Sequence, residues 1–170
     1  MNNNFNLMYM ISLLIKDYEI NTTKLNKLLF FCDLSYFLKN DITISEDDYL
    51  KLEYGPVAKN AKYYRNILVK NNLLKETVIN EYFYKQRFYK SPDNIYFRNI
   101  ESKLENNKKG SINVIKSVLD NLISFSAWEL SDITHKYAPW KSASDMEVLN
   151  FELSKNDKEL KKWLYSVNLF

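Results

Sequence analysis

Residues Lys24–Phe37 read KLNKLLFFCDLSYF, and this stretch decides the fold. Leucines at positions 25, 28 and 29 recur at helical spacing, and aromatic residues cover most of the other sides of the same helix. A helix that is apolar on nearly all sides lies buried in the core. The stretch therefore predicts a central buried helix over about residues 24–38, with the hydroxyl of Thr22 or Thr23 as its N-terminal cap.

Further helices are expected on both sides of this one, because a chain with only two glycines and three prolines has few natural breaks. Both glycines, Gly55 and Gly110, are expected just before a helix, with Pro56 in the first helical position. Ser126 and Glu129 match a capping box that opens a late helix ending near Tyr137. The expected helical segments are 4–18, 57–71, a stretch after Gly110, a stretch after Ser126, and one or two helices within 145–168.

Two segments predict β-structure. A short strand is expected within 42–54, and the β-branched and aromatic run 77–90 predicts a strand or hairpin. Residues 91–110 are polar and predict irregular structure with a short helix near 100–104. The sequence thus indicates a mainly α fold, namely a single helical domain with a central buried helix and a small β-strand or hairpin element.

The composition narrows the classes of function. At 170 residues the chain fits one domain, and its formal net charge of +3 is too small for a dedicated nucleic-acid binder. Cys32 is the only cysteine, which excludes an intrachain disulfide and is compatible with a reducing compartment. The first apolar run, residues 7–15, lacks a preceding basic region and is too short to span a bilayer. We expect a soluble, cytoplasmic protein that binds no membrane.

Three motifs stand in a fixed order along the chain. They are KLNKLLFF at 24–31, YGPV at 54–57, and SAWELSDITH at 126–135 with the Pro139-Trp140 pair behind it. In this order and at these separations they resemble the Panacea antitoxin domain, a SocA-like bacterial and phage family. The resemblance covers about residues 5–145 and leaves a helical tail over 146–170. The chain departs from the family pattern in a longer segment 92–109, and we expect no extra DNA-binding domain before the family region.

The resemblance implies an antitoxin that neutralises a cognate toxin, usually encoded next to it, by direct protein contact. It implies no enzyme activity and no cofactor, and it does not identify the toxin. It leaves open whether the protein forms a homodimer.

The candidate partner-binding residues come from the second and third motifs: Tyr54, Gly55, Pro56, Val57, His135 and Trp140. We expect Tyr54, His135 and Trp140 to lie close together, with Trp140 in a loop where an aromatic side chain can anchor a partner. The alternative is structural: a strand-to-helix corner at Gly55, and a histidine that closes the end of its helix.

Other functions remain as alternatives at this point. Residues 23–38 followed by a strand could form the recognition helix of a DNA-binding regulator of its own operon. His135, the only histidine, could act as a general base with Asp132 or Glu129. A metal site is not expected, because typical zinc sites need three or four Cys, His or carboxylate ligands. The acidic turn 46–48 is expected to be solvated. The aromatic run Tyr82-Phe83-Tyr84 with Phe88-Tyr89 is expected to be either core or a partner-binding strand.

Overall fold

The computed structural model describes residues 5–80, 82, 85–92 and 97–170, with the backbone alone at 97 and 98. The helices in chain order are α1 Phe5–Leu14, α2 Thr22–Asn40, α3 Ala61–Lys70, α4 Phe97–Asn107, α5 Ser111–Leu122, α6 Ala127–His135, α7 Ala138–Lys141, the 3-10 helix η1 Phe151–Asn156, and α8 Lys158–Ser166. The strands are β1 Ile20–Asn21, β2 Tyr49–Leu52, β3 Gly55–Ala58, β4 Lys75–Asn80 and β5 Lys85–Lys90.

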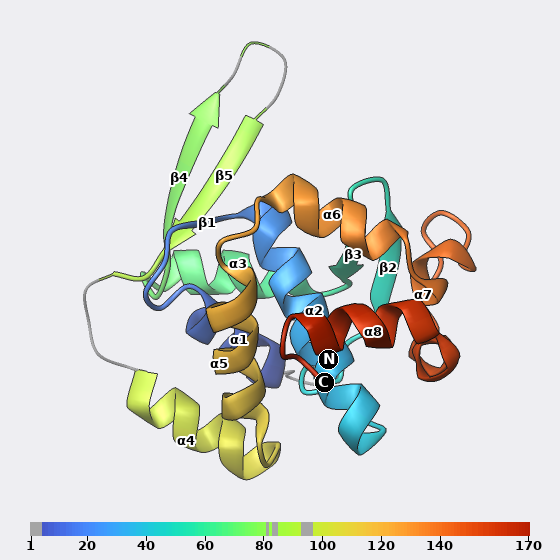
Figure 1. Cartoon of the computed structure of the whole chain (residues 1–170). Coiled ribbons are helices and arrows are strands. Elements are labelled where there is room, and N and C mark those ends of the chain that lie inside the picture. The colour runs from blue at the N-terminus through green and yellow to red at the C-terminus, as the bar shows by residue number, and fades with distance from the viewer. Residues whose placement is uncertain (1–4, 81, 83–84, 93–96) are drawn as a thin grey trace.

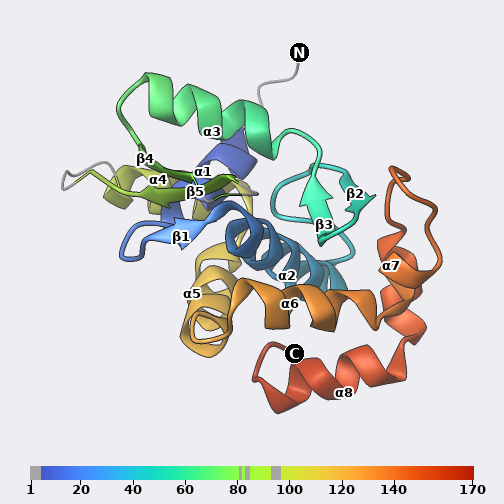
Figure 2. The same ribbon diagram turned by 90° about the horizontal axis from the view of Figure 1, so that it is seen from above.

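Helix α2 runs through the middle of the molecule, with α1, α5 and α6 packed against it (Figures 1 and 2). Every residue from Leu25 to Phe37 is buried. The expected cap at Thr22 or Thr23 is wrong: the cap is Asn21, whose side chain accepts a hydrogen bond from the Lys24 backbone N–H at 2.8 Å. Asn21 has the extended backbone of a capping residue, whereas both threonines already belong to the helix.

The described β-structure forms two small antiparallel sheets. One has the strand order β1-β5-β4, and the other pairs β2 with β3. The β4–β5 hairpin confirms the strand or hairpin predicted for 77–90, and it projects away from the helices (Figure 1). The fold is therefore mainly helical without being all-α.

The helix expected over 57–71 begins at Ala61, because Gly55 and Pro56 belong to β3. Leu52 pairs with Gly55, so Glu53 and Tyr54 close a tight turn between β2 and β3. Gly55 has a positive φ of 96°, a conformation that glycine adopts without strain. Gly110, in contrast, does precede a helix, as the N-cap residue of α5.

The other helices differ from expectation mainly at their ends. Helix α1 stops at Leu14 rather than at 18, and α4 occupies 11 residues of a segment expected to be largely irregular. The capping box of α6 is confirmed: Ser126 accepts from the Glu129 N–H at 3.1 Å, and the Glu129 carboxylate accepts from the Ser126 N–H at 2.7 Å.

The C-terminal elements contribute to the same core as the N-terminal ones. Leu160 and Leu164 are fully buried, Phe151 stacks against Tyr49 at 5.6 Å between ring centroids, and Trp163 lies 5.1 Å from Phe31. The organisation as a single domain stays a prediction, which this shared core supports. Within the described residues, no helix is both long and apolar enough to cross a membrane.

Candidate functional site

The turn between β2 and β3 is held against α6. Tyr54 lies at the tip of this turn with 57% of its surface exposed. Its carbonyl oxygen accepts a hydrogen bond from the Ser131 hydroxyl at 2.9 Å. The bond joins residues 77 positions apart in the sequence and fixes where the Tyr54 side chain leaves the surface.

The three sequence motifs meet directly beneath this turn. A Cβ added to Gly55 would lie 2.7 Å from Cε of Lys27 and 2.7 Å from Oγ1 of Thr134, which leaves room for glycine alone. Lys27 comes from the first motif, Gly55 from the second and Thr134 from the third. The recurrence of these motifs together thus has a packing explanation that needs no ligand.

Lys27 is a buried lysine with 1% of its surface exposed. Its Nζ donates a hydrogen bond to the Pro56 carbonyl oxygen at 3.2 Å, and no described carboxylate forms an ion pair with it. Burial lowers the pKa of Lys27 to about 7. An amine that loses its hydration without gaining a counter-charge is costly for the fold.

His135 and Trp140 form a stacked pair at the end of α6. Their ring centroids are 4.1 Å apart with planes inclined by 26°, and both residues are half-buried. Lys51 of β2 places its Nζ 4.0 Å from the centroid of the Trp140 ring and donates to the Ala143 carbonyl at 2.8 Å. Trp140 does not lie in a loop as expected: it belongs to the short helix α7, whose first turn accommodates Pro139.

The carboxylates near His135 are engaged elsewhere. Asp132 forms an ion pair with Lys136 at 2.6 Å, and Glu129 belongs to the capping box. Burial, followed by the positive charge of Lys27, lowers the pKa of His135 below its ordinary value of 6.5. Neither carboxylate orients the imidazole as a catalytic base would require. In the described part of the chain, no group of three or more His, Cys, Asp or Glu residues could hold a metal ion.

Trp128 of α6 is exposed, although it is not among the predicted site residues. It lies on the outer side of α6, with 74% of its surface exposed. The signal was available in the helical period, because Trp128 is about 200° around the helix from Leu130, which is fully buried. Tryptophan is enriched among the residues that contribute most of the binding energy at protein interfaces.

The acidic turn has a structural explanation, whereas the aromatic run is divided between exposed and buried residues where it is described. The carboxylate of Asp47 accepts two hydrogen bonds from Asn60, one from its backbone N–H at 2.9 Å and one from its side chain at 2.7 Å. Tyr82 is 95% exposed, whereas Phe83 and Tyr84 lie outside the described residues. Tyr89 on β5 is buried, so the run does not form one continuous exposed strand.

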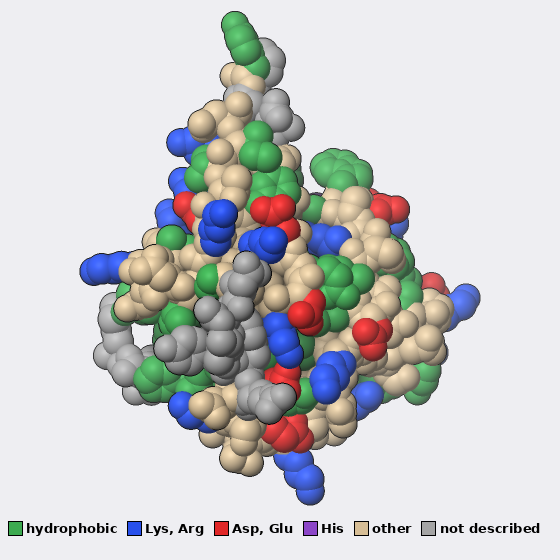
Figure 3. Space-filling model, turned by 90° about the vertical axis from the view of Figure 1, so that its left-hand side faces the viewer, with side chains coloured by type: hydrophobic (Ala, Val, Ile, Leu, Met, Phe, Trp, Pro, Cys, Tyr) green, Lys and Arg blue, Asp and Glu red, His purple; other side chains and the backbone are tan. Residues whose placement is uncertain are grey.

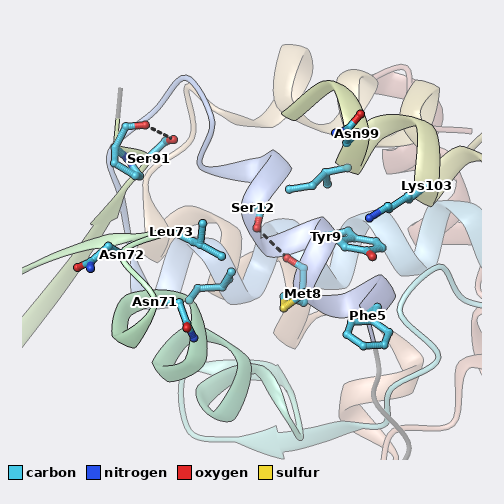
Figure 4. A pocket seen from close by; sticks show the side chains of 13 residues that line it. Phe5, Met8, Tyr9, Ser12, Asn71, Asn72, Leu73, Ser91, Asn99 and Lys103 are labelled. Atoms are coloured by element: carbon cyan, nitrogen blue, oxygen red, sulfur yellow. Dashed lines mark hydrogen bonds between the residues drawn. The ribbon is translucent and has the colours of Figure 1, made fainter. Parts of the chain in front are cut away.

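A cavity of about 680 Å³ opens elsewhere, between α1, the end of α3 and α4 (Figure 4). Its lining is mostly apolar and includes Met8, Tyr9 and Leu73, with Asn99 and Lys103 from α4. None of the predicted site residues lines it. The geometry therefore separates this cavity from the surface formed by the three motifs.

Comparison with known proteins supports the reading of the motifs. The family model described as antitoxin SocA-like, Panacea domain, matches residues 25–141, which is more than half of the chain. No curated protein and no solved structure matches the chain. The matched stretch runs from the first buried turn of α2 to the end of α7, and so contains Lys27, Tyr54, Ser131 and the His135–Trp140 stack. On this evidence the chain belongs to the SocA-like Panacea antitoxin domain family.

Proposed function

We propose that the protein is an antitoxin that neutralises a cognate toxin by direct contact through the surface formed by α6 and the β2–β3 turn. The family membership supports an antitoxin role in general, and the exposed aromatic residues of this surface support the place of contact. The mechanism would be occlusion, in which a rigid helical body covers the active surface of the toxin. A stable complex of this kind buries at least about 1,200 Å².

The observation that carries the proposal is the pair of aromatic anchors around Ser131. Tyr54 is bound to Ser131 through its carbonyl, and Trp128 precedes Ser131 by three residues on the same helix. Residues three apart in a helix lie on adjacent turns of one side. Tyr54 and Trp128 thus flank one position on α6, both with more than half of their surface exposed.

The remaining candidate residues have distinct parts in this proposal. Gly55 and Pro56 are buried and would shape the turn that presents Tyr54, while Val57 is half-buried beside it. His135 and Trp140 would form the other end of the surface, with their exposed parts available to a partner and their stacked rings holding α7 against α6. A cytoplasmic location is part of the same proposal.

Co-expression with the neighbouring open reading frame tests the function. That frame alone should arrest growth, and the wild-type chain should restore it. Trp128→Ala and Tyr54→Ala should each weaken the purified complex by about 2 kcal/mol or more, which titration calorimetry measures. Tyr165→Ala is the matched control, since Tyr165 is 60% exposed on α8 outside the family match. Wild-type affinity in both site variants would place the contact elsewhere.

The alternative of a DNA-binding regulator required α2 to act as the recognition helix, and the burial of α2 removes this support. A recognition helix presents side chains to a DNA groove, whereas residues 25–37 of α2 are all buried. Salt-dependent binding of the isolated protein to its own promoter would restore this alternative.

A further inference from the structure

The β4–β5 hairpin extends beyond the sheet that supports it. Strand β1 pairs with β5 only at Phe88 and Tyr89, so the remaining ladder up to the Asn80–Lys85 pair is a two-stranded ribbon (Figure 1). Isolated two-stranded ribbons are marginally stable in water. A ribbon that projects in this way presents both of its faces and the outer edge of β4.

The strand register assigns each side chain of the ribbon to a face. The inner face carries Glu76, Val78, Arg87 and Tyr89, with Lys85 at its far end, and at the base of the ribbon its charges are matched. The Arg87 guanidinium binds the Glu76 carboxylate at 2.8 Å, and Tyr89 is buried with the Arg65 guanidinium 5.5 Å from its ring centroid. The inner face at the base of the ribbon is thus an ordinary contact with the body of the protein.

The outer face has unmatched positive charge. Lys75 and Lys90 are directly opposite each other in the ladder, and both are exposed. Like charges in this position destabilise a strand pair. Among the described residues, no carboxylate forms a salt bridge with either, including that of Glu19 just before β1. Figure 3 shows Lys and Arg side chains gathered on the lower part of the projecting hairpin.

The same face also offers apolar surface next to the two lysines. Ile79 is 43% exposed, and Phe88 is half-buried beside its partner Thr77. Strand β4 pairs with β5 alone, which leaves its outer backbone edge without a neighbouring strand in the described structure. Free edges of this kind accept an additional extended segment through main-chain hydrogen bonds.

The net charge of the ribbon limits which kinds of extended segment can pair with β4. Residues 75–90 contain four basic and two acidic side chains, so the segment is positive. A second copy would bring a ribbon of the same sign to the edge, which disfavours self-pairing. An acidic extended segment would neutralise Lys75 and Lys90 and cover Ile79.

We propose that the outer face and free edge of the β4–β5 hairpin dock an extended acidic segment of a partner protein, with a carboxylate at Lys75, whose neighbour across the ladder is Lys90, and an apolar side chain on Ile79. The segment would add to β4 as a further strand. This surface is separate from the α6 surface, and the proposal does not depend on the antitoxin role.

A synthetic peptide with Glu and Val four positions apart is the probe, because in an extended strand this spacing puts both side chains on the face of Lys75 and Ile79. The same peptide with Lys in place of Glu, and oligo-deoxythymidine, are its competitors. The acidic peptide should bind the full chain with an affinity that falls as salt rises. Amide hydrogen exchange should slow within 75–80 on binding. Lys75→Glu should weaken binding about tenfold, whereas Lys116→Glu, on the exposed side of α5, should leave it unchanged.

Lys75→Glu places opposite charges across the ladder, so its melting temperature should be equal to or above that of the wild type. Loss of peptide binding in a protein of undiminished stability supports the proposal. Three results would overturn it: equal affinity in the Lys75→Glu and Lys116→Glu variants, preferential binding of oligo-deoxythymidine through Lys75, or a wild-type dimer that Lys75→Glu dissociates.

Discussion

The side chain of Lys27 passes directly beneath Gly55, so closely that a Cβ on the glycine would lie 2.7 Å from Cε and 2.9 Å from Nζ of the lysine. The two residues belong to different motifs, and each restricts which side chain fits at the other position. A larger residue at position 55 displaces the lysine from the Pro56 carbonyl. The lysine in turn fills the space under the turn that presents Tyr54.

Gly55→Ala should destabilise the fold more than Gly110→Ala. Both glycines have positive φ, 96° and 83°, so each substitution carries about 1 kcal/mol or more of backbone strain. Only Gly55 adds a steric clash of about 1–3 kcal/mol, because nothing lies within 4 Å of a Cβ at Gly110. Urea denaturation of the two variants measures the difference. Equal losses would mean that the turn and Lys27 move apart freely.

Lys27→Met should change how stability depends on pH. The folded-state pKa is about 7 against an ordinary 10.5, so between these values the unfolded chain binds a proton that the folded chain does not. The free energy of unfolding of the wild type therefore contains a contribution from Lys27. This contribution is fully present above pH 10.5 and is lost as the pH falls through about 7. Relative to Lys27→Met, the wild type should gain about 1 kcal/mol per pH unit between pH 7 and 9.

Denaturation curves of wild type and Lys27→Met at several pH values check this. Lys39→Met is the control, because Lys39 is exposed in the last turn of the same helix. Parallel profiles for wild type and Lys27→Met would show that the buried amine keeps an ordinary pKa.

Ser126→Ala should cost about 0.5–2 kcal/mol, because the Glu129 N–H loses the hydroxyl that accepts its hydrogen bond at 3.1 Å. Ser126→Thr should retain most of the stability, since threonine can cap in the same way. Thermal unfolding of both variants measures the effect. A folded Ser126→Ala protein that no longer binds its partner would reveal a contact residue instead of a cap.

Trp140→Ala should lower stability, whereas Trp128→Ala should not. The Trp140 ring stacks on His135 and lies under the Lys51 ammonium, contacts that together contribute about 2 kcal/mol. Trp128 is 74% exposed, and its removal should leave the melting temperature within a few degrees of the wild type. Calorimetric melting of the two variants distinguishes these roles. Equal losses of stability would mean that Trp128 also packs on the body.

The sequence predicted helices correctly where a pattern among neighbouring residues was sufficient to define them. The apolar run of α2 and the Ser126–Glu129 capping box depend on neighbouring residues only: the leucine spacing shows the first, and the Ser-x-x-Glu spacing shows the second. Gly55-Pro56 was misread as a helix start because the same pair suits a turn, and only the pairing of β2 with β3 decides between them. The true cap of α2, Asn21, was hidden by two adjacent threonines that are also good caps.

The candidate site was less accessible to sequence reasoning, because it depends on contacts between distant residues. The Ser131 to Tyr54 bond spans 77 positions, and no local pattern encodes it. The sequence shows that Lys27 belongs to the first motif. It does not show that this lysine is buried against the Pro56 carbonyl. The exposure of Trp128 could have been inferred from the helical period, had the buried face of α6 been traced from Leu130.

The aromatic contacts of η1 and α8 with α2 set an order of events during synthesis. Phe30 packs edge-on against Phe151 at 5.4 Å, and Phe31 lies 5.1 Å from Trp163, so the middle of α2 is covered by residues more than a hundred positions later. During synthesis the phenylalanines of α2 emerge before η1 and α8, and they lack this cover until the late segment has been made. A chain that stalls ahead of Phe151 lacks these contacts, so its apolar surface stays open. We expect such a truncated chain to be less stable and more prone to aggregation than the chain with η1 and α8.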